Sequence, residues 1–348
     1  MAFKTTAIST SNVKTSATTS NRPQVDYKAL EDYVIKTVDC EQPETLNGVI
    51  VGLVDLGEQA IKDSEYDVDK GDEDLTVEEL MEKYSSKLAE NFEGTEQFGK
   101  IVKFDLAYDN KLGKKVIKKF VKQAPRQCVS YIVDFPSILV DKGQFFGEDS
   151  EPKPLRLYSG GSFYNTFQKK ELIQNLLPLK WSNINTDKSG KPIFSLALTS
   201  QLHKMAVAAK LVKTGEPFTP DRVDELLGKT LQFKVQVGRN DKGYYFEKLG
   251  FVGAIQKKDT PYEDVNTFMI QFGEDNDPEA LSQLRKNVLN TIMNAINFKG
   301  DAIESQLKEL KPYLFKDEHE SPSVVKVDTK KVVKEEFVED TLDEDDWA

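Results

Sequence analysis

The sequence contains few residues of the types that build disulfide frameworks or zinc clusters. Among 348 residues there are two cysteines, Cys40 and Cys128, and two histidines, His203 and His319. Two cysteines cannot build a disulfide framework, and so small a Cys and His content argues against a zinc cluster. We therefore expect a reduced, cytoplasmic protein that carries no metal and no other cofactor.

Long apolar runs are also missing. No run approaches the roughly 20 residues that a membrane-spanning helix needs. The N-terminus is rich in Ser and Thr and lacks the apolar centre of a secretory signal. Because 39% of the residues are hydrophobic, the chain can still bury a core. These features predict a soluble, globular protein without a membrane partner.

Catalytic motifs are a third absence. Gly160-Gly161-Ser162 lacks the following Lys and the helix start that a phosphate-binding loop requires. His203 falls in a predicted amphipathic helix, where we interpret it as structural. Nearly all the dense carboxylate clusters lie in two acidic segments, and in these segments the distance between any two carboxylates cannot be inferred from the sequence. We find no triad, metal site or acid–base pair, which predicts that the chain is not an enzyme.

The net charge of −11 hides an uneven distribution of charge along the chain. Residues 61–100 carry 5 Lys and Arg against 13 Asp and Glu, and residues 317–348 carry 4 against 12. Residues 101–260 carry 27 against 16, an excess of 11 positive charges. A basic centre of this kind attracts polyanions such as nucleic acid. The alternative is a solvated, lysine-rich face without a ligand.

Composition divides the chain into four parts. Residues 1–24 are polar and rich in Ser and Thr, which favours a disordered arm. Residues 25–260 form the main predicted domain, with an acidic helical insertion at 63–100. Residues 261–316 contain two predicted helices, which pack on the main domain or on a second copy of the chain. Residues 317–348 form a predicted disordered, acidic tail.

The stretch from 193 to 255 has the clearest pattern of elements. Leu231, Phe233, Val235 and Val237 alternate with polar residues, which is typical of a half-buried strand. Here we expect a strand at 193–198, a helix at 201–213, a short helix ending at Leu227, a strand at 230–237 and a second hairpin arm at 244–249. Strand, helix and hairpin in this order predict the closing half of a small β-barrel.

The same periodicities predict the elements elsewhere in the chain. Helices are expected at 27–38, 169–176, 278–298 and 301–313. Strands are expected at 48–57, 101–108, 114–122, 127–135 and 155–158.

Basic and aromatic residues are interleaved through the central region. Single-stranded nucleic acid is bound by cations that follow the phosphates and by exposed rings that stack on bases, each stack being worth roughly 1–3 kcal/mol. For any one ring, ordinary core packing is the alternative interpretation. The candidate DNA contacts are Lys118, Lys119, Arg126, Arg156, Tyr158, Phe163, Tyr164, Trp181, Lys234, Arg239, Tyr244 and Phe246.

The acidic tail has a chemistry of its own. A flexible anionic segment can compete for a cationic groove while the groove is empty, and is released when DNA fills it. The tail ends in a large ring amid carboxylates, a pattern suited to docking on another replication or recombination protein; a tail that only aids solubility is the alternative. The candidate partner-binding residues are Asp343, Glu344, Asp345, Asp346 and Trp347.

Four segments of the chain carry a resemblance to a known family: Gly52-Leu53-Val54-Asp55-Leu56-Gly57, Gly215-Glu216-Pro217-Phe218-Thr219, Leu227-Gly228-Lys229-Thr230-Leu231 and Lys242-Gly243-Tyr244-Tyr245-Phe246. In these segments the chain resembles the phage-encoded single-stranded DNA-binding proteins of the OB-fold type. The resemblance covers roughly residues 48–256 without the acidic insertion. The tail is similar in design to the tails of bacterial and phage single-strand-binding proteins, which recruit replication and repair partners.

This resemblance implies a fold and a function. The fold is a β-barrel-centred α+β protein, an OB-fold-like, partly open five-stranded barrel with a helical insertion and C-terminal helices. The function is to coat single-stranded DNA without sequence preference in phage replication, recombination or repair, in the host cytoplasm. Two alternatives remain: a structural or assembly protein that binds an acidic protein partner through its basic face, and a nuclease or recombination enzyme that uses scattered carboxylates with magnesium.

Overall fold

The computed structural model describes most of the chain between residues 25 and 318. The described residues are 25–89, 97–146, 151–159, 161–165, 170–174, 177–178, 181–186, 192–241 and 243–318, of which 161–194 and 316–318 are described by their backbone alone.

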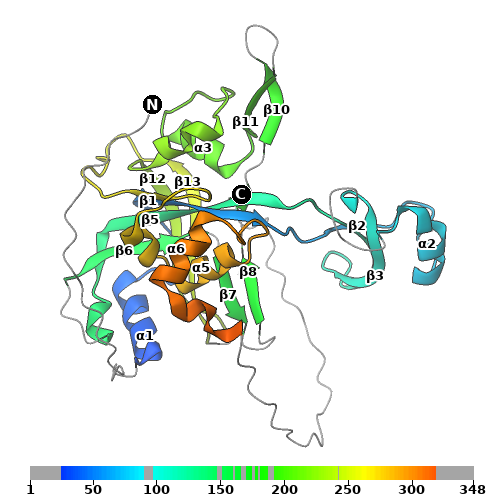
Figure 1. Ribbon diagram of the computed structural model, residues 1–348, viewed down its shortest axis with the longest axis horizontal. Helices are drawn as coiled ribbons and strands as arrows, with labels where there is room; N and C mark the ends of the chain where they lie inside the picture. Colours follow the sequence, from blue (N-terminus) through cyan, green and yellow to red (C-terminus); the bar gives the residue numbers. More distant parts are fainter. Residues whose placement is uncertain are drawn as a thin grey trace, which may run out of the picture.

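A seven-stranded sheet forms the centre of the molecule (Figure 1). Five strands follow the order β13-β12-β1-β5-β6 and are antiparallel, the antiparallel β9 lies beside β5, and the short β14 pairs parallel with β1. The strands are β1 (Glu44–Gln59), β5 (Arg126–Val140), β6 (Lys153–Tyr158), β9 (Leu177–Pro178), β12 (Thr230–Arg239), β13 (Tyr245–Ala254) and β14 (Phe268–Ile270). The predicted strands at 48–57, 127–135, 155–158 and 230–237 are confirmed.

β1 is apolar along most of its length because both of its faces are buried. Ile50 and Leu53 belong to one core and Val49 and Val51 to the other, and a bulge between Ile50 and Gly52 changes the alternation. Such a two-sided strand shows a continuous apolar run instead of alternation.

Helices cover the two faces of the sheet. The first core lies under α1 (Tyr27–Val38), α3 (Gln201–Ala208) and the 3₁₀ helix η4 (Pro220–Leu226). The second lies under α4 (Pro278–Ser282), α5 (Lys286–Met293), α6 (Ala302–Leu310) and the 3₁₀ helix η5 (Pro312–Glu318).

The helix predicted at 27–38 is confirmed, and its ends follow from local chemistry. The Asp26 carboxylate accepts a hydrogen bond from the Ala29 amide at 3.0 Å, which caps the first turn. Asp39 takes a left-handed conformation (φ 53°) and ends the helix. Val34 and Val38 are buried against the sheet.

The predicted five-stranded barrel is wrong. β13 and β6 are the two ends of the strand order, and no strand pairing joins them in the described residues. Instead the Arg285 side chain spans the gap, because it is bound to Glu247 on β13 and donates to the Arg156 carbonyl on β6 at 2.8 Å. The predicted strand at 193–198 also stays out of the sheet: β11 (Pro192–Leu196) pairs with β10 (Trp181–Thr186) in a separate ribbon. The fold is therefore α+β with an open central sheet.

The long connection between β1 and β5 forms an arm with its own small sheet (Figure 1). The arm contains β2 (Ser64–Asp67), α2 (Val77–Lys83), the 3₁₀ helix η1 (Ser85–Lys87), β3 (Ile101–Asp109) and β4 (Lys114–Val121). Leu80, Ile101 and Phe104 form its buried core. The predicted helical insertion thus contains one short α-helix, and the rest of the arm is built around a sheet in the order β2-β4-β3.

Two other predictions need correction. The segment predicted as a helix at 169–176 contains β8 (Lys170–Gln174), which pairs with β7 (Gly161–Asn165). The helix predicted at 278–298 is divided into α4 and α5.

A short 3₁₀ helix, η3 (Gly143–Phe145), follows β5.

Candidate nucleic-acid interface

Four of the predicted contacts lie together on the β12–β13 hairpin. Lys234 and Arg239 belong to β12, Phe246 belongs to β13, and Tyr244 precedes β13. The inward side chains of β12, including Phe233 and Val235, are fully buried. The opposite, outward side chains are half-buried, and we call their surface the hairpin face; it consists of Gln232, Lys234, Gln236, Phe246, Lys248 and Gly253.

The strand register arranges the hairpin face in rows. Phe246 lies opposite Gly238, Lys248 opposite Gln236, and Gly250 opposite Lys234. Facing residues of an antiparallel pair share one side of the sheet, so a ring and two lysines occupy successive rows. The Lys248 Nζ lies 5.1 Å from the centre of the Phe246 ring. The face therefore combines a stacking surface with cations at the spacing of neighbouring strand rows.

Glycines keep one end of the hairpin face flat. Gly253 pairs with Gln232, and a Cβ atom added at Gly253 would meet no atom within 4 Å. Two further exposed lysines, Lys257 and Lys258, precede Asp259, whose carboxylate accepts from the Asn47 Nδ2 at 2.8 Å. Because Asn47 lies opposite Gln232, these lysines border the same end of the face.

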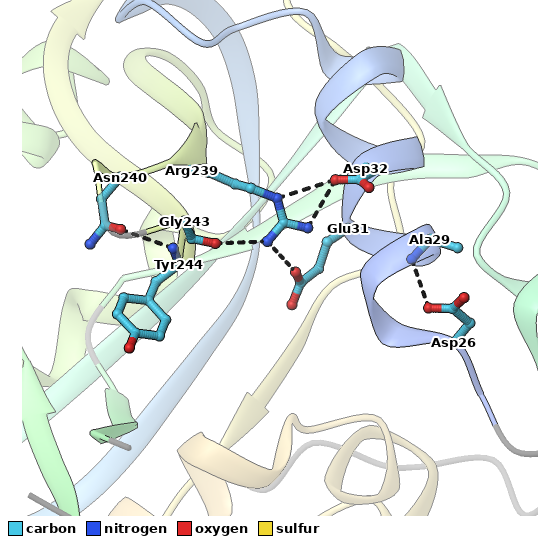
Figure 2. Close-up of polar contacts among 8 residues, drawn as sticks. All are labelled: Asp26, Ala29, Glu31, Asp32, Arg239, Asn240, Gly243 and Tyr244. Atoms are coloured by element: carbon cyan, nitrogen blue, oxygen red, sulfur yellow. Dashed lines mark hydrogen bonds and ion pairs between the residues drawn. The ribbon is translucent and has the colours of Figure 1, made fainter. Parts of the chain in front are cut away.

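Arg239 instead joins the hairpin to α1 (Figure 2). Its guanidinium is 2.8 Å from a Glu31 oxygen and 2.9 Å from an Asp32 oxygen, and it donates to the Gly243 carbonyl at 3.0 Å. The hydrogen bond that Arg239 donates to Asp32 is the main cause that raises the pKa of Arg239. A phosphate would have to displace two carboxylates here. Arg239 is therefore better explained as a structural ion pair between β12 and α1 than as a DNA contact. The Tyr244 ring is exposed beside it.

The two predicted contacts on the arm, Lys118 and Lys119, are neutralised by carboxylates. Lys118 is paired with Asp67 and, at 2.8 Å, with Asp109, and its side chain is only 10% exposed. Lys119 is paired with Asp69. These partners are more than eight residues away in sequence, and contact of either lysine with phosphate would require its ion pair to break.

Because the arm carboxylates are held in ion pairs, we expect the arm to unfold at a higher pH than the central sheet when the protein is acidified. Hydrogen bonds from Lys118, Lys119 and Lys83 hold the pKa values of Asp109, Asp69 and Asp72 below their ordinary range. A lowered folded-state pKa stabilises the arm above the ordinary carboxyl pKa, about 4, and this stabilisation is lost as the pH falls through the lower, folded value. Amide NMR spectra recorded from neutral to acidic pH should lose the dispersed arm signals first. Loss of arm and sheet signals in a single step would contradict this.

Arg156 and Tyr158 lie in a polar cluster at the gap between β6 and β13. Arg156 donates to both Asp134 oxygens, at 2.7 and 2.9 Å. The Tyr158 ring has the Arg285 guanidinium at 4.5 Å from its centre. Arg285 pairs with Glu247, whose side chain is 14% exposed. Burial alone would raise the pKa of Glu247, but Arg285 and Lys142 together hold it below its ordinary value.

Lys142 lies near this cluster, and in the described part of the chain no carboxylate is within ion-pair distance of it. Burial lowers the pKa of Lys142, while the nearby Glu247 opposes that shift. Arg156, Tyr158 and Arg285 are held by intramolecular contacts, so we interpret the cluster as structural. Arg285 and Glu247 were not predicted to share a cluster because neither stands out in a periodic pattern.

The remaining predicted contacts lie on three other strands, β5, β7 and β10, and in the C-terminal segment. Arg126 begins β5 and is half-buried. Phe163 and Tyr164 lie on β7 and Trp181 lies on β10, where the backbone alone is described. The tail candidates, Asp343 to Trp347, lie outside the described residues.

The described part of the chain also bears on metal binding and on membrane insertion. It contains no group of three or more His, Cys, Asp or Glu side chains that could hold a metal ion. No helix within it has both the length and the apolar character needed to span a bilayer. Comparisons with protein-family models, with curated proteins and with solved structures found no match.

Proposed function

We propose that the chain binds single-stranded DNA without sequence preference, and coats it during replication, recombination or repair, through the hairpin face. The observation that carries the proposal is the arrangement of Lys234, Lys248 and Phe246 on outward rows of one hairpin, half-exposed and next to the open surface at Gly253.

Each of these side chains has a distinct part in the proposed binding. Phe246 offers a ring on which a base can stack, and Lys248, beside that ring, can meet the phosphate next to the stacked base. Lys234 continues the cationic track one row beyond Lys248. Main-chain and side-chain groups that read base edges are not needed for such binding, so it tolerates any sequence.

Single strands suit this arrangement better than duplex DNA. A base can stack on a protein ring only when its face is not stacked on a neighbouring base, as in a flexible single strand. As far as the structure describes it, the hairpin face is a sheet surface, whereas the major groove of a duplex is entered by a helix or a separate two-stranded ribbon.

The acidic C-terminal segment has a part in this proposal that rests on sequence alone. We infer that Asp343 to Trp347 recruit a second replication or recombination protein once DNA occupies the hairpin face. A chain that ends before Glu335 should bind oligo-dT more tightly than the full chain if the segment competes with DNA. Equal affinities of the two chains would remove that competition from the proposal.

Substitution of Gly253 tests the hairpin face with little disturbance of the fold. The site has open space for a side chain, and Gly253 does not have the positive φ that only glycine favours. Gly253→Lys should tighten binding of labelled oligo-dT, and Gly253→Glu should weaken it, each about 5-fold at ~0.1 M salt. Gly253→Gln is the matched neutral control. Fluorescence anisotropy over a salt series, with duplex DNA as competitor, measures all four proteins.

Two outcomes would overturn the proposal. If all four proteins bind with the same affinity and salt dependence, DNA does not contact the hairpin face. If the native chain binds no oligonucleotide at any salt concentration, the basic residues serve an acidic protein partner instead.

A further inference from the structure

Among the described residues, one edge of the arm sheet has no neighbouring strand along most of its length. In the order β2-β4-β3, the outer edge belongs to β3. At its start, Ile101 accepts a hydrogen bond from the Ala89 amide at 2.7 Å. From Lys103 to Asp109 no other described strand pairs with this edge. Unprotected edge strands are templates for pairing with another chain.

This edge exposes large apolar side chains. Leu106 is 57% exposed and Tyr108 is 52% exposed. They share a side of the arm sheet with the buried Phe104, because alternate residues of a strand point the same way. α2 covers the Phe104 end through Leu80 but leaves the Leu106 end open. The apolar surface of β3 is therefore only half covered in a single chain.

The sequence of β3 is complementary to itself in the antiparallel direction. With a two-fold axis at Leu106, each Leu106 faces the partner subunit's Leu106, and Phe104 faces the partner subunit's Tyr108. On the other side of the sheet, Lys103 and Asp109, which pair with Asp105 and Lys118 within one chain, come to facing positions across the axis. Aromatic pairs and opposite charges in facing positions stabilise strand pairs. Ile117, which lies opposite Leu106 on β4, extends the apolar row in both copies.

The charges of the arm favour the same direction. The β3–β4 turn exposes Lys111, Lys114 and Lys115, while α2, which packs at the other end of β3, exposes Glu78, Glu79 and Glu82. Antiparallel pairing brings the basic turn of each copy toward the acidic helix of the other. Parallel pairing would place like charges together.

We propose that two copies of the chain associate through antiparallel pairing of their β3 edges, centred on Leu106, into a six-stranded sheet shared by the two arms. The association uses no residue of the hairpin face, so it can be tested apart from DNA binding.

Sedimentation velocity of the full chain tests the association. We expect a dimer over a range from about 1 to about 100 μM, and Leu106→Lys should raise the dissociation constant about 100-fold by placing two charges at the axis. Leu112→Lys is the matched control, because Leu112 is equally exposed but lies in the turn outside the paired row. A native chain that stays monomeric, or an unchanged dimer in Leu106→Lys, would overturn the proposal.

Cross-linking tests the position of the axis. Leu106→Cys should form a covalent dimer under mild oxidation, whereas Leu112→Cys should not, since the two copies of residue 112 would be on the order of 30 Å apart. The native thiols will not interfere, because burial raises the pKa of Cys40 to about 11 and that of Cys128 to about 12. Equal cross-linking of the two variants would contradict a two-fold axis at Leu106.

Discussion

Exchange of both Lys234 and Lys248 for glutamate should weaken binding to oligo-dT by at least about 25-fold at ~0.1 M salt. Each phosphate contact to a single strand contributes about 0.7 to the slope of log affinity against log salt. Loss of two contacts should therefore make the slope less steep by about 1.4, and repulsion from the new carboxylates adds to the loss of affinity. Anisotropy titrations at several salt concentrations measure both quantities.

A matched double variant separates a local effect from a change of net charge. Lys204 and Lys210 are exposed on and just after α3, which covers the other face of the sheet. Lys204→Glu with Lys210→Glu makes the same change of net charge and should leave the slope almost unchanged. Equal losses in the two double variants would mean that the whole field of the protein, not the hairpin face, attracts DNA. Thermal melts of both variants confirm that they are folded.

Elements with local signals were predictable from the sequence. The helix at 27–38 has an Asp cap and an apolar stripe, and the strand at 230–237 alternates strictly, so both were predicted close to their observed bounds. The helix prediction for 169–176 was wrong because the structure of this segment depends on β7, with which β8 pairs. Pairing with a neighbouring strand can override a local preference for helix.

The barrel was wrong for a similar reason. Strand order depends on contacts between distant segments, and the pattern of β13 and β6 does not reveal whether they meet. In the structure Arg285, which follows Glu247 by 38 residues, occupies the gap between these strands. A single arginine in a stretch without strand pattern gives no sequence signal for this role.

The candidate site was predicted in part. Lys234 and Phe246 lie on one face of the hairpin. They could be predicted because the alternation of polar and apolar residues in the hairpin is visible in the sequence. Lys118 and Lys119 looked available because the sequence does not show that Asp67 and Asp69, about 50 residues earlier, lie beside them. Lys248 and Gly253 were overlooked although the same alternation places them on the hairpin face.

Replacement of Arg285 by methionine should lower the free energy of unfolding by about 3 kcal/mol. The substitution keeps an apolar stem but leaves the Glu247 carboxylate buried without its partner, and it removes the hydrogen bond to the Arg156 carbonyl. Removal of one member of a buried pair usually costs 3–5 kcal/mol, and we take the lower end, about 3, because 32% of the Arg285 side chain is exposed. Urea unfolding at neutral pH measures the change.

A second substitution distinguishes the unpaired charge from lost packing. Arg285→Met combined with Glu247→Met removes both charges, and should recover much of the lost stability because no buried carboxylate remains. Lys308→Met breaks the exposed pair with Glu304 and should have a much smaller effect than Arg285→Met. If Arg285→Met is as mild as Lys308→Met, Arg285 does not hold the two sheet edges together.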